Sequence, residues 1–361
     1  MRHLELFAGI GGFRQALELL TKDGVMSFQN IGFSEIDKNA VSTYKSCYNP
    51  GPKELELGDI VAFTSDYNNI LKLQEFDLLT GGFPCQAFSM MGHQKGFGEG
   101  RGQMFFRIVD ILETLKDRKP KYLLLENVKN LYTHDNKRTY RVIREKLEDL
   151  GYQVYDDIFN TADFHLPQKR NRLYIFATTV MPQNGVLFNF SAPVIADYFN
   201  SRIEKFSGMK HKTVLEILEE EVDKKYYLSE RIKPTILSDG SKGYKSNSEI
   251  NQVIARPLTA TMHKMHRACQ DNYYSQDFIE SKGAINVAKY ATKEELLRLP
   301  IRRITPEEAF MIQGFPKEFV IKARNAGVSD GALYKQAGNA VSVNIIYAIM
   351  LYLIENKIIA K

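Results

Sequence analysis

A cysteine and a glutamate each follow an apolar run that is expected to form a strand. Cys85 comes after the run Asp77–Thr80 and the turn Gly81-Gly-Phe-Pro84, where the proline stiffens the backbone beside the thiol. A lone cysteine is usually a small buried hydrophobe, but this one stands in a sharp polar loop, and its thiolate would be a strong nucleophile. Glu126 ends the run Tyr122–Leu125, where a carboxyl group at the rim of an apolar sheet is desolvated enough to be protonated part of the time. The pair therefore fits a nucleophile assisted by a general acid.

Three further segments indicate a site for a nucleoside. In Phe7-Ala-Gly-Ile-Gly-Gly12 a strand runs through glycines into a helix, so backbone amides can approach a ligand closely. Glu35 follows the next apolar run, where a carboxylate can hydrogen-bond both hydroxyls of a ribose. Asp59 and Ile60 add a carboxylate and an apolar side chain against which an adenine could lie. Each acid alone is typical of a solvated loop, but together they describe a nucleoside site.

The elements that must position these residues alternate along the first half of the chain, which predicts a parallel α/β sheet. The expected strands are Leu4–Phe7, Asn30–Ser34, Asp77–Thr80, Tyr122–Leu125 and Leu173–Ala177, and the expected helices are Gly12–Leu20, Lys38–Cys47, Met104–Lys116 and Tyr140–Leu150. In an open α/β sheet the carboxyl ends of the parallel strands share one edge. We therefore expect Phe7, Glu35, Asp59, Cys85 and Glu126 to converge there.

The composition is that of an ordinary globular protein, with 44% hydrophobic and 25% charged residues. The three cysteines, Cys47, Cys85 and Cys269, are too few and too scattered for a disulfide framework or a zinc site, so we expect a reducing cytosol and no metal. The amino terminus turns polar before any apolar run long enough for a signal peptide develops. The apolar run Val341–Ile354 is shorter than a membrane span, and we expect a packed terminal helix and no membrane partner.

The pattern becomes irregular after about residue 183, which predicts a second, smaller domain. We expect a catalytic and cofactor-binding domain at 1–185 and 332–361, and a second domain with its hinge at 186–331. Residues 231–270 hold an excess of Lys and Arg with Tyr, His and Met interleaved. That composition is expected where a phosphate backbone is bound, although a solvated loop can share it. The net charge of +5 permits a nucleic-acid partner without requiring one.

Several motifs, in order along the chain, resemble those of the bacterial DNA (cytosine-5) methyltransferase family of restriction–modification type. The resemblance rests on the loop Phe7–Gly12, Gly82-Phe-Pro-Cys-Gln86, Glu126-Asn-Val128, Gln168-Lys-Arg-Asn-Arg172, Gln313-Gly-Phe-Pro316 and Gln336-Ala-Gly-Asn-Ala-Val341. Between the two matching ends of the chain, only Arg256-Pro-Leu-Thr-Ala260 fits the family. The resemblance implies a class I, Rossmann-like α/β fold with a mostly parallel seven-stranded sheet and helices on both faces. It also implies a smaller, irregular, mostly β target-recognition domain.

Residue roles are implied by the same resemblance, position by position. S-adenosylmethionine would be the methyl donor, leaving S-adenosylhomocysteine, and its pocket would be formed by Phe7, Gly9, Ile10, Gly12, Glu35, Ile36, Asp59, Ile60, Gly82, Pro84, Asn339 and Val341. Cys85 would attack carbon 6 of a cytosine, and Glu126 would contact the ring nitrogens. Arg172 would reach the carbonyl oxygen, and Arg170 would support that cluster or a nearby phosphate. Ala340 stands where relatives often carry Ser, which should alter one cofactor contact.

Double-stranded DNA is the partner that the resemblance implies, and the target base must leave the stacked duplex before it can react. The glycine-rich segment Ala87–Gly102 is expected to close over the DNA as a lid, with a plain connector as the alternative. The expected DNA contacts are Gln86, Ser89, His93, Lys95, Arg101, Arg256, Thr259, His263 and Lys264. A monomer in the bacterial cytoplasm, encoded by a bacterium or a phage, is the default. A cognate restriction endonuclease acting separately is an open alternative to an enzyme that works alone.

Three other functions are to be distinguished from this one. A dinucleotide-dependent dehydrogenase also needs a glycine loop and a ribose-binding acid, but it has no use for Cys85 and Glu126. A catalytically silent DNA-binding module of the same fold conflicts with the intact cysteine and glutamate. Transfer RNA could replace DNA as the substrate, but the large basic middle segment favours a duplex whose bases are read in the major groove.

Overall fold

The structure of the 361-residue chain is a computed structural model, and it describes all residues except 85–103, 181–187, 239–247, 265–268, 290 and 361. The chain forms two compact units. The first comprises Met1–Asn160, Asn171–Ser207 and Ile345–Lys361, and the second comprises Thr161–Arg170 and Gly208–Asn344. These boundaries differ from the expected ones, because residues 188–207 belong to the first unit, whereas 161–170 and 332–344 belong to the second.

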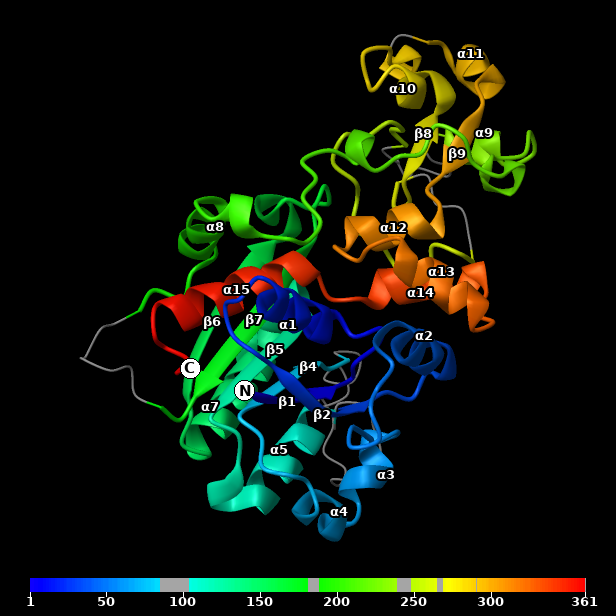
Figure 1. Ribbon diagram of the computed structural model, residues 1–361. Helices are drawn as coiled ribbons and strands as arrows, with labels where there is room; N and C mark the ends of the chain where they lie inside the picture. Colours follow the sequence, from blue (N-terminus) through cyan, green and yellow to red (C-terminus); the bar gives the residue numbers. More distant parts are fainter. Residues whose placement is uncertain (85–103, 181–187, 239–247, 265–268, 290, 361) are drawn as a thin grey trace. The chain divides into compact units, whose positions relative to one another are not determined.

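A seven-stranded sheet with the order β3-β2-β1-β4-β5-β7-β6 forms the centre of the first unit (Figure 1). Its strands are β1 (Arg2–Leu6), β2 (Gln29–Ser34), β3 (Leu55–Glu56), β4 (Leu78–Gly82), β5 (Tyr122–Val128), β6 (Gln153–Asn160) and β7 (Asn171–Thr178). The pairs from β3 through β5 are parallel, whereas β7 runs antiparallel to both of its neighbours. All strands except β7 therefore point the same way, which confirms the expected mostly parallel sheet.

Helices lie on both sides of this sheet. In the first unit they are α1 (Gly12–Lys22), α2 (Lys38–Tyr48), α3 (Ile60–Thr64), α4 (Tyr67–Leu71), α5 (Met104–Leu115), α6 (Lys129–Thr133), α7 (Arg138–Asp149), α8 (Ala192–Asn200) and α15 (Val343–Glu355). Leu4, Leu6, Leu79 and Leu125 point to one face and join a single apolar cluster with residues of α3, α4, α5 and α7. Strand side chains alternate between faces, so Glu5 points to the other face, where α1 and α15 lie (Figure 1).

The carboxyl-terminal apolar run forms α15, as expected. Within the described part of the chain, one helical stretch, Asp330–Glu355, is long and apolar enough to cross a membrane, but 94% of its most apolar window is buried. On α15, Tyr347 donates a hydrogen bond to Asp23 Oδ2 at 2.8 Å, and its ring packs against Phe199 and Phe206. This helix is part of the core.

The second unit contains a small antiparallel sheet and short helices. The sheet pairs β8 (Tyr273–Ser275) with β9 (Ile301–Arg303), and the helices are α9 (Lys233–Ile236), α10 (Gln276–Glu280), α11 (Lys293–Arg298), α12 (Pro306–Ile312), α13 (Glu318–Asn325) and α14 (Asp330–Asn339). The small sheet fits the expected mostly β domain, whereas the helices α12 to α14 were not expected. Arg302 on β9 forms an ion pair of 2.7 Å with Glu308 on α12, and both side chains are fully buried.

Candidate cofactor and catalytic site

The loop that follows β1 keeps three residues in left-handed backbone conformations. The φ angle is +53° at Phe7, +56° at Gly9 and +79° at Gly11, and α1 begins at Gly12. Positive φ is uncommon for a residue with a side chain, and such strained positions cluster at functional sites. A Cβ added at Gly9 would meet no atom within 4 Å, so the loop faces open space there. A ligand can therefore approach the backbone of this loop closely.

Glu35 lies directly after β2, and its carboxylate accepts three backbone hydrogen bonds. Its Oε2 accepts from the N–H of Gly9 at 2.8 Å, and its Oε1 accepts from those of Ile36 and Asp37 at 2.8 Å each. These bonds connect the end of β2 to the loop after β1 and fix the carboxylate at the edge of the sheet. This is the place at which an acid can bind the hydroxyls of a ribose.

Two exposed apolar side chains that lie near Glu35 and Asp59 in the sequence are Ile36, which was predicted for the cofactor pocket, and Val61, which was not. Asp59 caps α3, and its Oδ1 accepts from the N–H of Val61 at 2.9 Å. The Ile60 side chain is only 3% exposed and packs into the core, and Ile10 is 1% exposed. By contrast, Ile36 is 71% exposed and Val61 is 37% exposed. An adenine at this edge would therefore find its apolar contacts on Ile36, which was predicted, and on Val61, which was not.

The exit of β4, which leads to the predicted nucleophile, is held by a buried asparagine. Gly82 ends β4 and pairs in register with Glu126 on β5. Asn127 Nδ2 donates to the carbonyl oxygen of Phe83 at 2.8 Å, which fixes the backbone directly before Pro84. Sequence reasoning did not single out Asn127, although it lies between two residues of a recognised motif. Cys85 itself lies outside the described residues, as do the expected lid Ala87–Gly102 and the predicted DNA contacts Gln86, Ser89, His93, Lys95 and Arg101.

Glu126 and Arg172, predicted to act on the same base, form an ion pair. Arg172 Nε lies 3.0 Å from Glu126 Oε1, and the two side chains are 19% and 10% exposed. The antiparallel register of β5 and β7 places Arg172 opposite Val128, which brings it to the carboxyl end of β5. Because both groups are largely removed from water, their attraction is stronger than that of a surface pair, and it orients the carboxyl group.

Arg170, two residues earlier, belongs to the second unit and has a different environment. Its side chain is buried, and its guanidinium donates to the carbonyl oxygens of Leu258 at 2.9 Å, Gly338 at 3.1 Å and Ala340 at 3.1 Å. These contacts join three chain segments that are far apart in the sequence. The arrangement is that of a structural arginine, whereas the resemblance implied that Arg170 supports the cluster around the target base or contacts a nearby phosphate.

Two buried glutamines extend this junction. Gln168 Oε1 accepts from the N–H of Leu258 at 2.8 Å, and Gln313 Nε2 donates to the carbonyl oxygen of Ala337 at 2.8 Å. The motif segments around 168, 256, 313 and 336 are thus packed together within the second unit. Asn339 and Val341, both predicted for the cofactor pocket, come directly after this packed segment in the sequence. Asn339 is exposed at the end of α14.

Basic side chains gather around His263 in the second unit. Partial burial lowers the pKa of His263, and the charges of Lys264, Lys335 and Arg303 lower it further. The Arg303 guanidinium also lies 4.9 Å from the centre of the Tyr334 ring. His263 and Lys264 were predicted as DNA contacts, whereas Arg303 and Lys335 were not, because they lie far along the chain. Such a cluster favours a phosphate backbone.

The other two predicted contacts in this unit, Arg256 and Thr259, are partly buried. The backbone N–H of Arg256 donates to Asn272 Oδ1 at 2.8 Å, and Asn272 Nδ2 donates to the Arg256 carbonyl oxygen at 3.1 Å. The Arg256 guanidinium donates to the carbonyl oxygen of Asp271 at 3.4 Å. The structure therefore places Arg256 beside β8 and Thr259 against α14, where the backbone of Gly338 is close.

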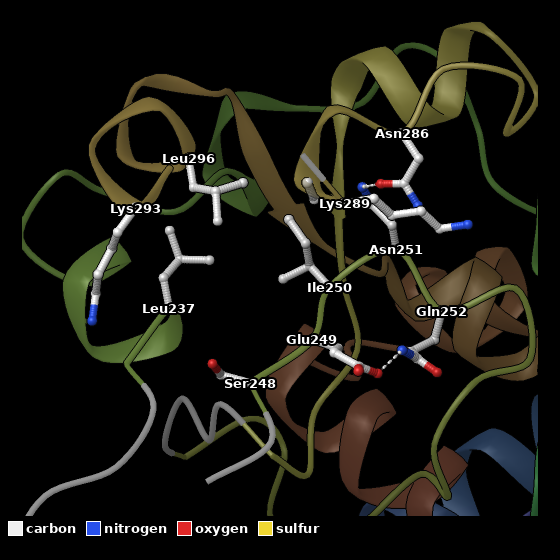
Figure 2. A pocket seen from close by; sticks show the side chains of 11 residues that line it. Leu237, Ser248, Glu249, Ile250, Asn251, Gln252, Asn286, Lys289, Lys293 and Leu296 are labelled. Atoms are coloured by element: carbon white, nitrogen blue, oxygen red, sulfur yellow. Dashed lines mark hydrogen bonds between the residues drawn. The ribbon is translucent and has the colours of Figure 1, made fainter. Parts of the chain in front are cut away.

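A separate hollow of about 700 Å³ lies in the second unit (Figure 2). Apolar side chains, lysines and a hydrogen-bonded pair of asparagines line it, among them Leu237, Ile250, Leu296, Lys289, Lys293, Asn251 and Asn286. None of the predicted site residues contributes to its walls. Among the described residues, no three His, Cys, Asp or Glu side chains gather in a way that could hold a metal ion.

Comparison with known proteins assigns this arrangement to a family. The profile of the C-5 cytosine-specific DNA methylase family matches residues 1–355 of the chain. The chain belongs to this family. The methylase is thus a DNA (cytosine-5)-methyltransferase, and S-adenosylmethionine is the methyl donor of its family. The resemblance and the enzyme class inferred from the motifs are confirmed, and the dehydrogenase alternative is excluded.

Curated relatives match almost the whole methylase. Type II methyltransferase M1.ScrFI of Lactococcus lactis subsp. cremoris is 36% identical over 358 residues, which cover 98% of this chain and 77% of the relative. Type II methyltransferase M.SsoII of Shigella sonnei is 36% identical over 357 residues, covering 96% and 78%. Type II methyltransferase M.NlaX of Neisseria lactamica is 34% identical over 346 residues, covering 96% and 94%.

Solved structures support the fold of the methylase. The Entamoeba histolytica methyltransferase EhMeth superposes with a TM-score of 0.72 at 20% identity, over 99% of this chain and 98% of that one. The S. pombe Dnmt2 methyltransferase superposes with a TM-score of 0.69 at 18% identity, over 98% of each chain. At these identities the likeness concerns the fold alone, and it confirms the predicted class I methyltransferase architecture.

Proposed function

We propose that this methylase transfers a methyl group from S-adenosylmethionine to carbon 5 of a flipped-out cytosine within a specific short duplex DNA sequence, with Cys85 as the covalent nucleophile. The observation that carries the proposal is the convergence of its groups at one edge of the sheet. The loop after β1, Glu35 after β2, the exit of β4 and the Glu126–Arg172 pair all lie at this edge.

The residues of the first unit fit the cofactor. The open backbone around Gly9 would hold its methionine part, Glu35 its ribose hydroxyls, and Asp59 with Ile36 and Val61 its adenine. In the second unit, Asn339 and Val341 are proposed as further contacts. S-adenosylmethionine supplies an electrophilic methyl group on a sulfonium, so the chain must only bind it, orient it and deliver a nucleophilic carbon to it.

Carbon 5 of cytosine is a poor nucleophile, and the proposed role of the side chains is to change that. Attack of the Cys85 thiolate on carbon 6 breaks the aromaticity of the ring and places electron density on carbon 5. The negative charge that develops on the ring is stabilised by the Glu126 carboxyl at N3 and by the Arg172 guanidinium at the carbonyl oxygen. Removal of the carbon 5 proton after methylation expels Cys85 and restores the ring.

The second unit is proposed to bind the DNA. Lys264, Arg303 and Lys335, which gather around His263, supply positive charge for the phosphates, which provides affinity but no sequence information. Because the relatives are named type II methyltransferases, we propose that the recognised sequence is short and specific and that the enzyme is of bacterial or phage restriction–modification type. A separate endonuclease would then share that sequence.

The proposal is tested by transfer of tritiated methyl from S-adenosylmethionine to unmethylated duplex DNA, with wild type compared with Cys85→Ser. We expect incorporation by the wild type, recovery of the label as 5-methylcytosine, and no incorporation by the variant. Transfer RNA in a parallel reaction is the control for substrate class. Labelling of transfer RNA and not of DNA would overturn the DNA assignment, and equal activity of the Cys85→Ser variant would overturn the mechanism.

A further inference from the structure

Two tyrosines of α2 pack directly onto the glycine that precedes α1. Tyr48 Oη donates a hydrogen bond of 2.6 Å to the carbonyl oxygen of Gly11. A Cβ added at Gly11 would lie 2.4 Å from Tyr48 Cε2 and 2.9 Å from Tyr44 Cε2. Tyr44 in turn stacks on Phe33 of β2, with ring centres 4.1 Å apart. The end of the loop is therefore in contact with α2 as well as with the sheet.

Arg14, in the first turn of α1, holds both tyrosine rings in place. Its guanidinium carbon lies 4.4 Å from the centre of the Tyr48 ring and 5.2 Å from that of Tyr44. Its Nη1 lies 2.6 Å from Glu54 Oε1, and the two side chains are only 11% and 7% exposed. The aromatic faces attract the cation, and the charge-assisted hydrogen bond to Glu54 orients its guanidinium. The Tyr48 ring is therefore restrained relative to α1.

The Tyr48 hydroxyl is a permanent donor to the loop. Burial raises the pKa of Tyr48 well above its ordinary value, so the hydroxyl keeps its proton at working pH. The loop is also held by Glu35, which accepts a hydrogen bond from the N–H of Gly9. Glu35 is a proposed ligand of the ribose, whereas neither Tyr48 nor Arg14 belongs to the proposed cofactor contacts. These two residues therefore act on the loop without a direct part in the proposed site.

We propose that Tyr48, held by Arg14, is a positioning residue that keeps the loop 7–11 in the conformation that binds S-adenosylmethionine. The inference rests on the proposed function, because it assumes that this loop holds the cofactor. The loop contains Gly9 and Gly11, which can adopt many backbone conformations when they are not restrained. Apparent affinity falls in proportion to the fraction of molecules in the competent conformation, so loss of the restraint weakens cofactor binding.

The test is equilibrium binding of S-adenosylhomocysteine by titration calorimetry to wild type, Tyr48→Phe and a matched control, Tyr152→Phe. Tyr152 Oη donates to the carbonyl oxygen of Pro120 at the same 2.6 Å, is buried in the same unit and lies outside the loop. A single buried hydrogen bond accounts for roughly a five- to tenfold change in an equilibrium. We therefore expect the Kd to rise about five- to tenfold in Tyr48→Phe and to stay within about twofold of wild type in Tyr152→Phe.

The kinetic constants of Tyr48→Phe provide a second measurement, which would not change in the same way if Tyr48 contributed to stability alone. In Tyr48→Phe the KM for S-adenosylmethionine should rise while kcat at saturation is retained, because the bound cofactor restores the loop. Arg14→Lys, which keeps the charge but loses the planar contact with the rings, should raise the Kd by a smaller factor. Equal affinities of Tyr48→Phe and Tyr152→Phe would overturn the inference and leave the proposed function intact. A wild type that binds no S-adenosylhomocysteine would overturn the proposed cofactor site and the inference with it.

Discussion

Replacement of Arg170 by methionine separates a structural role from a catalytic one. The guanidinium is buried and donates to three carbonyl oxygens, at 2.9 Å on Leu258 and at 3.1 Å on Gly338 and Ala340. Methionine fills most of the volume but leaves those oxygens without their donor. Each hydrogen bond to a charged group contributes about 1.5–3 kcal/mol. Removal of the buried charge also removes its desolvation cost, which offsets part of the loss of three such bonds, so we expect a destabilisation of roughly 3–5 kcal/mol.

Urea unfolding followed by circular dichroism measures this loss, since the chain has no tryptophan. With a slope of about 3 kcal/mol per molar urea, we expect the midpoint to fall by about 1–1.7 M. At temperatures where Arg170→Met is still folded, it should bind S-adenosylhomocysteine and retain some methyl transfer. By contrast, Arg172→Met should lose methyl transfer with a smaller loss of stability, since Arg172 is more exposed. A variant Arg170→Met with wild-type stability and no activity would refute the structural role and restore the sequence-based one.

Three more changes test other parts of the structure. Burial raises the pKa of Glu5 to about 8 from an ordinary 4.5, so the folded state binds this proton more tightly than the unfolded state. The free energy of unfolding should therefore fall as pH rises from about 4.5 to about 8, by at most about 1.4 kcal/mol per pH unit. Urea unfolding at pH 5 and pH 8 should show a smaller fall in Glu5→Gln than in wild type, and equal falls would contradict the assignment. Gly338→Ala would place a Cβ within 2.4 Å of the backbone at 259–260 and should destabilise the protein by about 2 kcal/mol or more, whereas Gly51→Ala, with no atom within 4 Å, is the matched control. Arg303→Met should weaken DNA binding equally for all sequences and reduce the salt dependence of log K by about 1, and an unchanged slope would remove Arg303 from the phosphate contacts.

The sheet and its functional edge could be predicted because they follow from local signals. All five expected strands and all four expected helices are present, with ends shifted by a few residues. Glu35 and Glu126 are found at the carboxyl ends of β2 and β5, as the alternation of strands and helices predicts. Strand β6 was missed because Asp156 and Asp157 interrupt its apolar pattern, which suits a strand at the edge of the sheet.

The parts of the site that were not predicted depend on contacts between residues far apart in the sequence, and no local sequence pattern predicts such contacts. Arg170 and Arg172 are separated by one residue, yet one is buried among carbonyl oxygens and the other pairs with Glu126. The chain passes between the two units at that point, so the motif around them divides into two environments. In the same way Arg303 and Lys335 join His263 only through the fold of the second unit. Ile60 faces the core because α3 packs that side against the sheet.

The covalent role of Cys85 is tested most directly by trapping the enzyme on duplex DNA made with 5-fluorodeoxycytidine in place of deoxycytidine. Fluorine at carbon 5 cannot leave as a proton does, so an enzyme that has attacked carbon 6 and methylated carbon 5 cannot be expelled. We predict a complex that survives denaturation, requires S-adenosylmethionine, carries the nucleotide on the peptide containing Cys85, and is absent in Cys85→Ser. Methylation of ordinary DNA without any trapped complex, or a nucleotide found on Cys47 or Cys269, the two free cysteines among the described residues, would contradict the mechanism.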